Sequence, residues 1–399
     1  MLDKKTLKDL DVQGKKVIVR VDFNVPMKKG AVGEIADDVR IRAALPTIEY
    51  LLENGAAVLL LSHLGRPKGE AKPEFSLAPV AKRLGELLDK EVKFYDSETV
   101  VDDSVKEKAK NLQPGEIALL QNTRYRKEEE KNDVGFAKEL SELGDLYVND
   151  AFGTSHRAHA SNVGLASNLP SAIGFLVQKE VDSMANMLED PKRPFVAIMG
   201  GAKVSDKIGV IENLLSKVDT LLIGGGMAYT FLKAQGYEIG RSLLEADKVE
   251  LSAELIDKAK SRGVNLLLPL DVVIAKEIDE NAETEIVDIT EIPADMEGLD
   301  IGPKTRDLFA EEIARAKTVV WNGPMGVFEV TPFAAGTNAV AKALAEADAV
   351  TIVGGGDSAL AIEQAGLTDQ ISHVSTGGGA SLELLEGKEL PGIAAMEDK

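Results

Sequence analysis

Short, nearly continuous runs of Val, Ile and Leu recur along the first half of the chain and alternate with helical patterns. Runs without polar alternation are typical of parallel strands that are buried on both faces. The alternation therefore predicts an α/β fold, with a doubly wound, mostly parallel, Rossmann-like sheet. The expected strands are Lys16–Val21, Ala57–Leu61, Ile117–Leu120 and Leu146–Val148, and the expected helices are 43–52, 77–88 and 135–143.

The second half of the chain shows the same alternation of apolar runs and helical patterns. A chain of 399 residues is long enough for two domains. Residues 271–288 instead alternate apolar and polar side chains, so we expect antiparallel strands there, added at one edge of the sheet. The expected buried strands of this half are Phe195–Met199, Thr220–Ile223, Thr318–Trp321, Ala349–Val353 and Ile371–Val374.

Between the two series, Ser171–Leu188 is predicted to form one long helix that joins the domains. The N-terminal domain then covers residues 1–170, the interdomain helix 171–190, and the C-terminal domain 191–387. The apolar tail, residues 388–399, is expected to return to the first domain. The chain then crosses between the domains twice, and we expect hinge closure about the 171–188 helix and the returning tail.

The strands of the first half are followed by arginine and histidine. Because the carboxyl ends of parallel strands meet at one edge, these side chains predict an anion site there. The segments are Asp22-Phe23-Asn24, Ser62-His63-Leu64-Gly65-Arg66, Asn122-Thr123-Arg124 and Ser155-His156-Arg157-Ala158-His159, with Arg40 at the start of the first helix. Alternatively, the arginines are solvated charges, the three histidines bind a metal, and Asp22 and Asn24 cap a loop rather than accept ligand hydroxyls.

The strands of the second half end in glycine. Glycine lets backbone approach a ligand and leaves N–H groups free, so we interpret these turns as a nucleotide site. The segments are Gly200-Gly201, Gly224-Gly225-Gly226, Asn322-Gly323-Pro324, Gly354-Gly355-Gly356-Asp357-Ser358 and Thr376-Gly377-Gly378-Gly379. Lys203 and Lys207 are expected on one face of the first helical turn after Gly201, with an anion between them; two solvated lysines are the alternative.

Two acidic residues leave alternatives open. Asp357 begins a helix and either caps it or coordinates Mg²⁺ beside phosphates. Glu329 lies among apolar residues, where it either holds a ribose hydroxyl or faces solvent.

Composition narrows the class of protein. The net charge of −20 argues against nucleic acid and anionic membranes as partners. The chain has no cysteine, which excludes disulfides and Cys-ligated zinc and is consistent with a cytoplasmic protein. We see neither a run of about 18 apolar residues nor a secretory signal.

Taken in order, five segments resemble phosphoglycerate kinase, a two-domain, usually monomeric family of glycolytic enzymes. The resemblance runs through essentially the whole chain. The segments are Arg20-Val21-Asp22-Phe23-Asn24-Val25-Pro26, Ser62–Pro67, Asn149–His159, Gly200–Lys207 and Trp321–Gly326.

The resemblance implies transfer of phosphate between 1,3-bisphosphoglycerate and MgADP, giving 3-phosphoglycerate and ATP. It implies that Asp22 and Asn24 hold the glycerate hydroxyl, and that His63, Arg66, Arg124 and Arg157 hold the 3-phosphate region. Phe23, Leu64 and Gly65 belong to the same substrate site. Arg40 is implied at the carboxyl-phosphate end, and Lys203 on the phosphoryl group in transit.

On the nucleotide side, the resemblance implies that Lys207 binds phosphate and Glu329 binds ribose. Gly355, Gly356 and Ser358 are implied to line the phosphates, with Asp357 on magnesium. The chemistry of the transfer itself predicts a catalytic role for the N–H groups at 377–379, Gly378 among them. A further nucleotide contact at Gly298 is implied by the family alone, since nothing in its surroundings indicates one.

The residues also fit this reaction when the family resemblance is set aside. The carboxylate nucleophile has a pKa of about 4, so it needs no general base, and we find no base-like His–Asp pair in the second half. A dehydrogenase is one rival, but a G-x-G-x-x-G motif followed by an acidic residue is absent. A non-catalytic sugar-phosphate binding protein is the other; it would need neither the lysine pair nor Asp357.

Overall fold

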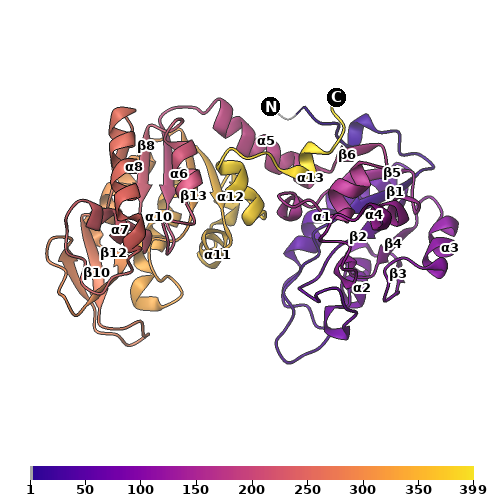
Figure 1. Cartoon of the computed structure of the whole chain (residues 1–399), viewed down its shortest axis with the longest axis horizontal. Helices are drawn as coiled ribbons and strands as arrows, with labels where there is room; N and C mark the ends of the chain where they lie inside the picture. Colours follow the sequence, from indigo (N-terminus) through magenta and orange to yellow (C-terminus); the bar gives the residue numbers. More distant parts are fainter. Residues whose placement is uncertain (1–2) are drawn as a thin grey trace. The chain divides into compact units, whose positions relative to one another are not determined.

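The computed structural model describes residues 3–399, which divide into two compact units. Unit 1 runs to Asp182 and also contains Glu389–Lys399; unit 2 is Ser183–Lys388. In Figure 1, unit 1 is drawn mainly in indigo and magenta, and unit 2 mainly in red, orange and yellow. The chain passes from unit 1 to unit 2 within helix α5 (Phe175–Glu189).

Unit 1 is built on one six-stranded sheet of order β3-β4-β2-β1-β5-β6, in which every pair of neighbours is parallel. The central strands are buried along almost their whole length, which explains their unbroken Val, Ile and Leu runs. The strands are β1 Lys16–Arg20, β2 Ala57–Leu61, β3 Val92–Tyr95, β4 Ile117–Leu120, β5 Leu146–Asn149 and β6 Ser171–Ile173.

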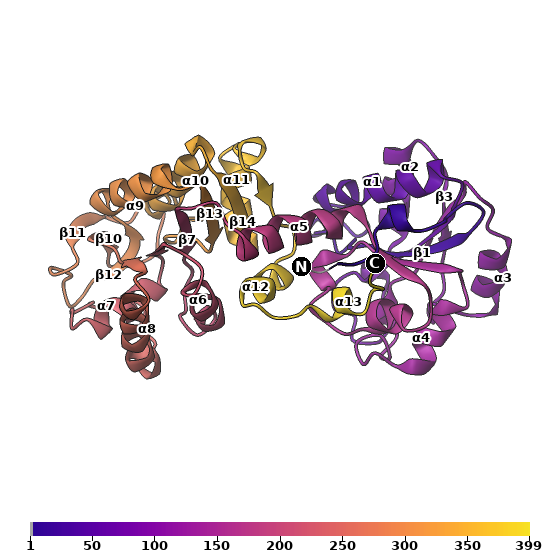
Figure 2. The same cartoon turned by 90° about the horizontal axis from the view of Figure 1, so that it is seen from above.

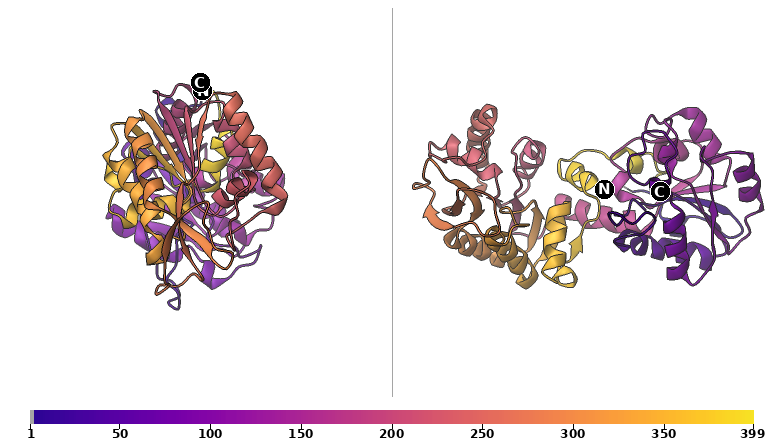
Figure 3. Two further views of the ribbon diagram at one scale, coloured as in Figure 1. Left: turned by 90° about the vertical axis from the view of Figure 1, so that its left-hand side faces the viewer. Right: turned by 90° about the horizontal axis from the view of Figure 1, so that it is seen from below.

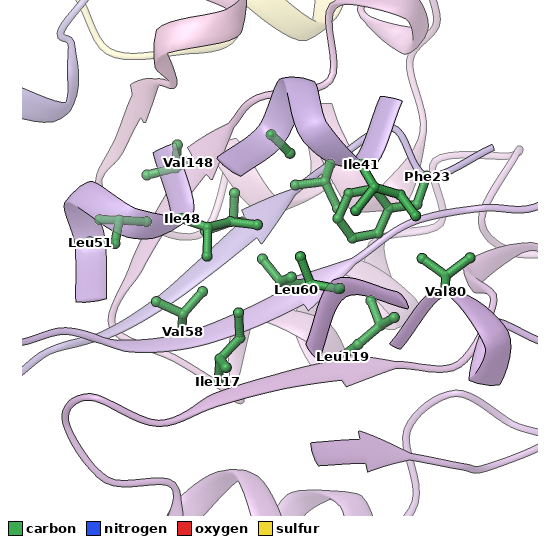
Figure 4. Packing of buried hydrophobic residues seen from close by; sticks show 14 of the residues in the cluster. Phe23, Ile41, Ile48, Leu51, Val58, Leu60, Val80, Ile117, Leu119 and Val148 are labelled. Atoms are coloured by element: carbon green, nitrogen blue, oxygen red, sulfur yellow. The ribbon is translucent and has the colours of Figure 1, made fainter. Parts of the chain in front are cut away.

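Helices cover both faces of this sheet. Helices α1 and α2 lie on one face and α4 on the other (Figure 2). Figure 4 shows the core under α1 and α2, where Ile41, Ile48 and Val80 meet side chains of β2, β4 and β5. The helices of unit 1 are α1 Val39–Glu53, α2 Ala78–Leu88, α3 Asp103–Asn111, α4 Val134–Ser141, the first half of α5 and α13 Pro391–Ala394.

Unit 2 has a second six-stranded parallel sheet, of order β15-β14-β13-β7-β8-β9. When only the strands of this sheet are numbered, the order is the Rossmann order 3-2-1-4-5-6, with the topological switch between β7 and β13. The strands are β7 Phe195–Met199, β8 Thr220–Ile223, β9 Asn265–Leu267, β13 Thr318–Asn322, β14 Val350–Gly354 and β15 His373–Val374.

Two groups of helices enclose that sheet, α9, α10 and α11 on one face and α6, α7, α8 and α12 on the other (Figures 2 and 3). Phe309 of α9 and Leu344 of α10 are completely buried against Trp321 of β13. The helices are α6 Ile208–Leu214, α7 Met227–Ala234, α8 Val249–Ser261, α9 Pro303–Arg315, α10 Ala335–Glu346, α11 Gly356–Gln364 and α12 Gly379–Leu385.

A separate antiparallel sheet of order β11-β10-β12 completes unit 2. Its strands are β10 Asp271–Ala275, β11 Glu285–Asp288 and β12 Glu297–Ile301. The predicted antiparallel strands in 271–288 are therefore present, but they do not extend the parallel sheet: β10 pairs with β11 on one side and with β12 on the other. Within residues 3–399, no helix is long and apolar enough to cross a membrane.

The prediction of a single helix over Ser171–Leu188 is wrong in its first turn. Residues Ser171–Ile173 form strand β6 beside β5, and the helix begins at Phe175. Gly174 lies between the two elements, and a Cβ at this position would overlap the Asp150 carboxylate.

Candidate functional site

The topology of unit 1 brings the arginine-bearing segments to one edge of its sheet. Strands β1, β2, β4 and β5 are parallel, so the residues that follow them gather at their shared carboxyl end. The order in which strands are added to the sheet reverses between the parallel neighbours β1 and β5, where the Asp150 N–H donates to the Arg20 carbonyl at 2.9 Å. The candidate anion site is therefore at the switch point of the sheet.

Arg20 and His63 form the buried base of this site. Arg20 Nε donates to Ser161 Oγ at 2.8 Å, and its Nη2 lies 3.0 Å from His63 Nδ1. A guanidinium group can only donate, so His63 Nδ1 accepts and its Nε2 carries the proton. Burial, followed by the charges of Arg20 and Arg124, holds the pKa of His63 well below its ordinary value. His63 is therefore a neutral donor at pH 7.

The loops after β1 and β2 are tied together above that base. Arg40 Nη1 donates to the Asn24 carbonyl at 2.8 Å and approaches Asp22 Oδ1 at 3.3 Å. Asn24 Oδ1 accepts the N–H of Gly65 at 2.8 Å. Asp22, Asn24 and Arg40 are all partly exposed, so each has hydrogen-bonding groups that can face a ligand.

Arg124 joins the segment after β4 to the same place. Its Nη1 donates to the Gly65 carbonyl at 3.0 Å, and its backbone N–H donates to Asn122 Oδ1 at 3.0 Å. Asn122 Oδ1 also accepts the Leu64 N–H at 3.2 Å. One buried amide thus fixes the two loops that carry Leu64 and Arg124.

Arg66 and Arg157 are exposed, and neither forms an ion pair with a carboxylate among residues 3–399. Arg157 Nε lies 3.4 Å from His156 Nε2. His159 is buried nearby, and burial lowers its pKa to about 4. Within residues 3–399, no group of three His, Cys, Asp or Glu side chains is placed so that it could hold a metal ion, so the geometry does not favour the three-histidine metal alternative.

In unit 2 the glycine turns meet at the switch between β7 and β13. The Gly200 N–H donates to the Asn322 carbonyl at 2.9 Å, and the Gly201 N–H donates to the Pro324 carbonyl at 3.0 Å. A Cβ on Gly323, whose φ is +99°, would overlap the Gly200 backbone. Only glycine permits this close approach of two strand ends.

Two pockets open beside these turns. The first, which we call the Gly298 pocket, has a volume of about 280 Å³ and includes Gly226, Tyr229, Gly298 and Glu329. The second, the Gly355 pocket, has a volume of about 320 Å³. Its lining includes Lys207, Asn322, Gly355, Gly356, Ser358 and Gly378. Asp357 lines both pockets, so the two are adjacent.

Lys207 points into the Gly355 pocket, where its Nζ hydrogen-bonds Asn322 Oδ1. Burial lowers the pKa of this ammonium group, and the carboxylates of Asp206 and Asp357 oppose that shift. Ser358 is fully buried, and its Oγ accepts the Gly323 N–H at 2.7 Å. Ser358 thus shapes the turn that lies under the pocket.

These contacts correct two predictions. Lys203 and Lys207 do not share a helical turn, because α6 begins only at Ile208 and Lys207 is its N-cap residue. Lys203 is exposed and lies outside the lining of both pockets. The N-cap alternative for Asp357 is also wrong, since Gly355 caps α11 with φ +93° and Asp357 lies in the first turn.

A sequence model of the phosphoglycerate kinase family matches residues 7–388. The chain belongs to the phosphoglycerate kinase family. It is 61% identical over 398 residues to a phosphoglycerate kinase of Finegoldia magna, and 62% identical over 399 residues to one of Clostridium novyi. In both comparisons the match covers 100% of each chain.

Solved structures agree with this family membership. The structure of phosphoglycerate kinase from Coxiella burnetii matches with a TM-score of 0.89 and 44% identity. That from Pyrococcus horikoshii matches with a TM-score of 0.81 and 36% identity, and both matches cover 98% of each chain. The protein is thus an ATP-binding glycolytic kinase with phosphoglycerate kinase activity, a phosphotransferase with a carboxyl group as acceptor, and the dehydrogenase and binding-protein rivals are set aside.

Gly298 is the residue of the Gly298 pocket that reasoning from the residues missed. It lies inside β12, and a Cβ there would overlap the hydroxyl of Tyr229. A lone glycine within a strand often marks a close approach of another group. That signal was present in the sequence, but it does not say which group approaches.

Proposed function

We propose that the protein transfers a phosphoryl group reversibly from 1,3-bisphosphoglycerate to MgADP, with the glycerate compound held by unit 1 and the nucleotide by unit 2. One observation carries this assignment. The arginines gather at the switch point of one sheet, while the glycine turns and Lys207 line the pockets at the switch point of the other. Arginine suits a small polyanion, whereas glycine turns suit a phosphate chain approached by backbone.

In unit 1, Asp22 and Asn24 bind the glycerate hydroxyl through the polar groups that face away from the loop contacts. His63, Arg66, Arg124 and Arg157 bind the 3-phosphate region, with Phe23, Leu64 and Gly65 around it. Arg40 reaches the carboxyl-phosphate end. Of its five N–H donors, the contacts to Asn24 and Asp22 involve only Nη1, so several remain for the substrate.

In unit 2, the base and ribose occupy the Gly298 pocket, with Glu329 on the ribose hydroxyls. The phosphates occupy the Gly355 pocket, with Lys207 and the N–H groups of Gly355 and Gly356. The adjacency of the pockets at Asp357 supports this order along one ligand.

Magnesium fits the same place. Mg²⁺ usually binds one or two carboxylates together with substrate phosphates, and Asp357 offers one exposed carboxylate where the phosphates are proposed to lie. When bound there, the ion neutralises phosphate charge.

The chemistry needs no proton transfer. In the ATP-forming direction, an oxygen of the ADP β-phosphate forms a bond to the acyl phosphorus. The bond from phosphorus to the carboxyl oxygen breaks, and 3-phosphoglycerate leaves as a carboxylate. Arg40, Lys203 and the Gly378 N–H stabilise the charge of the moving group, and each such donor is typically worth a few kcal/mol.

The proposal also requires the two ligands to meet. Transfer requires reacting atoms about 3–3.5 Å apart, and the ligands are assigned to different units. We therefore include a closing motion about α5, which also excludes water from the acyl phosphate. All assigned residues belong to one chain, which supports a monomer as the working form.

A co-crystal of the whole chain with a nucleotide and 3-phosphoglycerate tests the assignment, together with an assay of ATP formation from ADP and 1,3-bisphosphoglycerate. We expect turnover, 3-phosphoglycerate against Arg124 and Arg157, and nucleotide against Gly298 and Gly355. Both ligands in one unit would overturn the proposal.

A further inference from the structure

The walls of the Gly298 pocket are mostly apolar. Leu299 and Val327 lie in its lining, and so do Leu243 and Ile278, whose side chains remain 49% and 53% exposed. Two large apolar side chains exposed at the rim of a pocket fit the flat faces of an aromatic ring. Few polar groups in this lining could form hydrogen bonds with the edge of such a ring.

Tyr229 supplies one of these polar groups. It lies in the first turn of α7, and its ring is buried in a cluster with Leu232, Val272 and Ile274 between that helix and the antiparallel sheet. The side chain is only 3% exposed, yet it lines the Gly298 pocket. Its hydroxyl reaches β12 at Gly298, where a Cβ would overlap it.

The hydroxyl of Tyr229 has no hydrogen-bond partner within residues 3–399. Two nearby polar groups are engaged elsewhere. The Gly298 N–H donates to Ser242 Oγ at 2.9 Å, and the Asp300 carboxylate accepts the N–H groups of Gly336 at 2.8 Å and Ile301 at 2.9 Å. The Tyr229 oxygen is not one of the fully buried polar atoms that lack a partner, so it is open to the Gly298 pocket, where a ligand can accept its proton.

We propose that Tyr229 is a base-recognition residue, whose hydroxyl donates a hydrogen bond to a ring nitrogen of the purine base bound in the Gly298 pocket. This inference rests on the proposed placement of the nucleotide in that pocket, and it adds a specific polar contact to it.

The electrostatic surroundings favour the donor role. Burial, and then the carboxylates of Asp300 and Glu297, raise the pKa of the Tyr229 hydroxyl. The group therefore keeps its proton throughout the physiological range. A purine ring nitrogen carries a lone pair in the plane of the ring, which is the acceptor that such a hydroxyl requires.

The test measures ADP affinity of the whole chain by calorimetry, for the wild type and for Tyr229→Phe. Removing the hydroxyl should raise the Kd for ADP about three- to tenfold, the loss expected for one neutral hydrogen bond. The second ligand set is 1-deaza-, 3-deaza- and 7-deaza-ADP, in each of which one ring nitrogen is a C–H group. The wild type should bind one of the three more weakly by a similar factor, and Tyr229→Phe should bind that analogue and ADP equally.

Tyr237→Phe is the matched control, because Tyr237 packs against the same apolar cluster and does not line the pocket. It should leave the Kd for ADP unchanged, and an equal loss in this variant would overturn the inference. So would an unchanged Kd in Tyr229→Phe, or a loss in that variant that is the same for ADP and all three analogues.

A separate variant distinguishes failure of this inference from failure of the proposed nucleotide site. Leu243→Asp places a carboxylate in the wall of the Gly298 pocket at a half-exposed position, so the fold should tolerate it. Weaker ADP binding by this variant with an unaffected Tyr229→Phe would overturn the hydrogen bond alone. Unchanged ADP binding by Leu243→Asp would overturn the pocket assignment itself.

Discussion

At the scale of single residues, two lysines four positions apart have different surroundings. Lys207 is largely buried and held by Asn322 at the Gly355 pocket. Lys203 is exposed, on the turn that precedes α6. A cation that binds the nucleotide phosphates before transfer must be held in a fixed position. A cation that stabilises the phosphoryl group during transfer must be free to move with that group. The two lysines are therefore expected to affect different kinetic constants.

Lys203→Ala should lower kcat by roughly 10²-fold or more, because a cation that stabilises the transition state is lost. The affinity for ADP should change little, because Lys203 does not line the nucleotide pockets. Steady-state kinetics and calorimetry measure the two effects. Lys276→Ala, another exposed lysine, should change neither quantity. Near-normal turnover of Lys203→Ala would remove Lys203 from the mechanism.

Arg157→Ala should weaken binding of 3-phosphoglycerate by about tenfold or more, because one charge-assisted phosphate contact is lost. The KM for ATP should be unaffected, since Arg157 belongs to unit 1. Initial rates measured over both substrates separate the two constants. Arg262→Ala, an exposed arginine of unit 2, is the control. A selective loss of nucleotide affinity in Arg157→Ala would mean that the ligands are assigned to the wrong units.

Site residues that follow strands can be predicted from the sequence, because the carboxyl ends of parallel strands always lie at one edge of the sheet. Asp22, His63, Arg124 and Gly355 all follow strands and all lie at a switch edge. The partners of these residues were not predictable. Nothing local to Gly298 indicates that Tyr229, 69 positions earlier, occupies the space beside it, because that contact depends on how α7 packs on the antiparallel sheet.

At the scale of elements, the start of α5 depends on a buried carboxylate. Asp150 is completely buried, and its Oδ1 accepts the Leu176 N–H at 2.9 Å at the first turn of the helix. The Phe175 N–H donates to Thr47 Oγ1 at 3.0 Å. The first free N–H groups of α5 are therefore bound by side chains of unit 1.

Asp150→Asn should change how stability depends on pH. Burial raises the pKa of Asp150 to about 7, whereas the unfolded chain releases this proton near pH 4. The folded state therefore binds the extra proton between these values, and stability falls as pH rises from about 4 to about 7. The asparagine variant lacks this slope, so the free energy of unfolding of the wild type should fall relative to the variant by roughly 2–4 kcal/mol over that range.

Urea unfolding at pH 4.5, 5.5 and 7.5 measures this difference for both proteins. The control is Asp257→Asn, at an exposed position of α8, where folding changes the surroundings of the side chain little. A constant difference between wild type and Asp150→Asn across the range would show that Asp150 is ionised in the folded state.

Strands with strong apolar runs were predicted at nearly their observed bounds, whereas weaker ones were not. Strand β3 has the sequence Val-Lys-Phe-Tyr and lies at the edge of its sheet, where half-buried positions tolerate a lysine. The sequence pattern predicts a helix where β6 lies, because these three residues continue the apolar pattern of α5. Pairing with β5, a tertiary contact, decides its conformation.

At the scale of the whole molecule, the mechanism predicts a change of size. Binding of 3-phosphoglycerate together with a nucleotide should reduce the radius of gyration measured by small-angle scattering, because transfer requires the two ligands to meet. Either ligand alone should have a smaller effect, and Arg157→Ala should need a higher 3-phosphoglycerate concentration for the same compaction. A radius that stays constant with both ligands at saturation would count against closure about α5.

The order of the chain has a consequence for synthesis. The final residues complete unit 1: Lys4 Nζ donates to the carbonyl of Met396 at 2.8 Å, and Asn149 Nδ2 donates to that of Gly392 at 2.8 Å. Residues near the two ends also pair directly, through an isolated antiparallel bridge between Lys4 and Asp398. A ribosome that has made all of the first 182 residues has therefore not yet made the segment that closes over them. The nascent protein must finish its second half before its first half acquires its last native contacts.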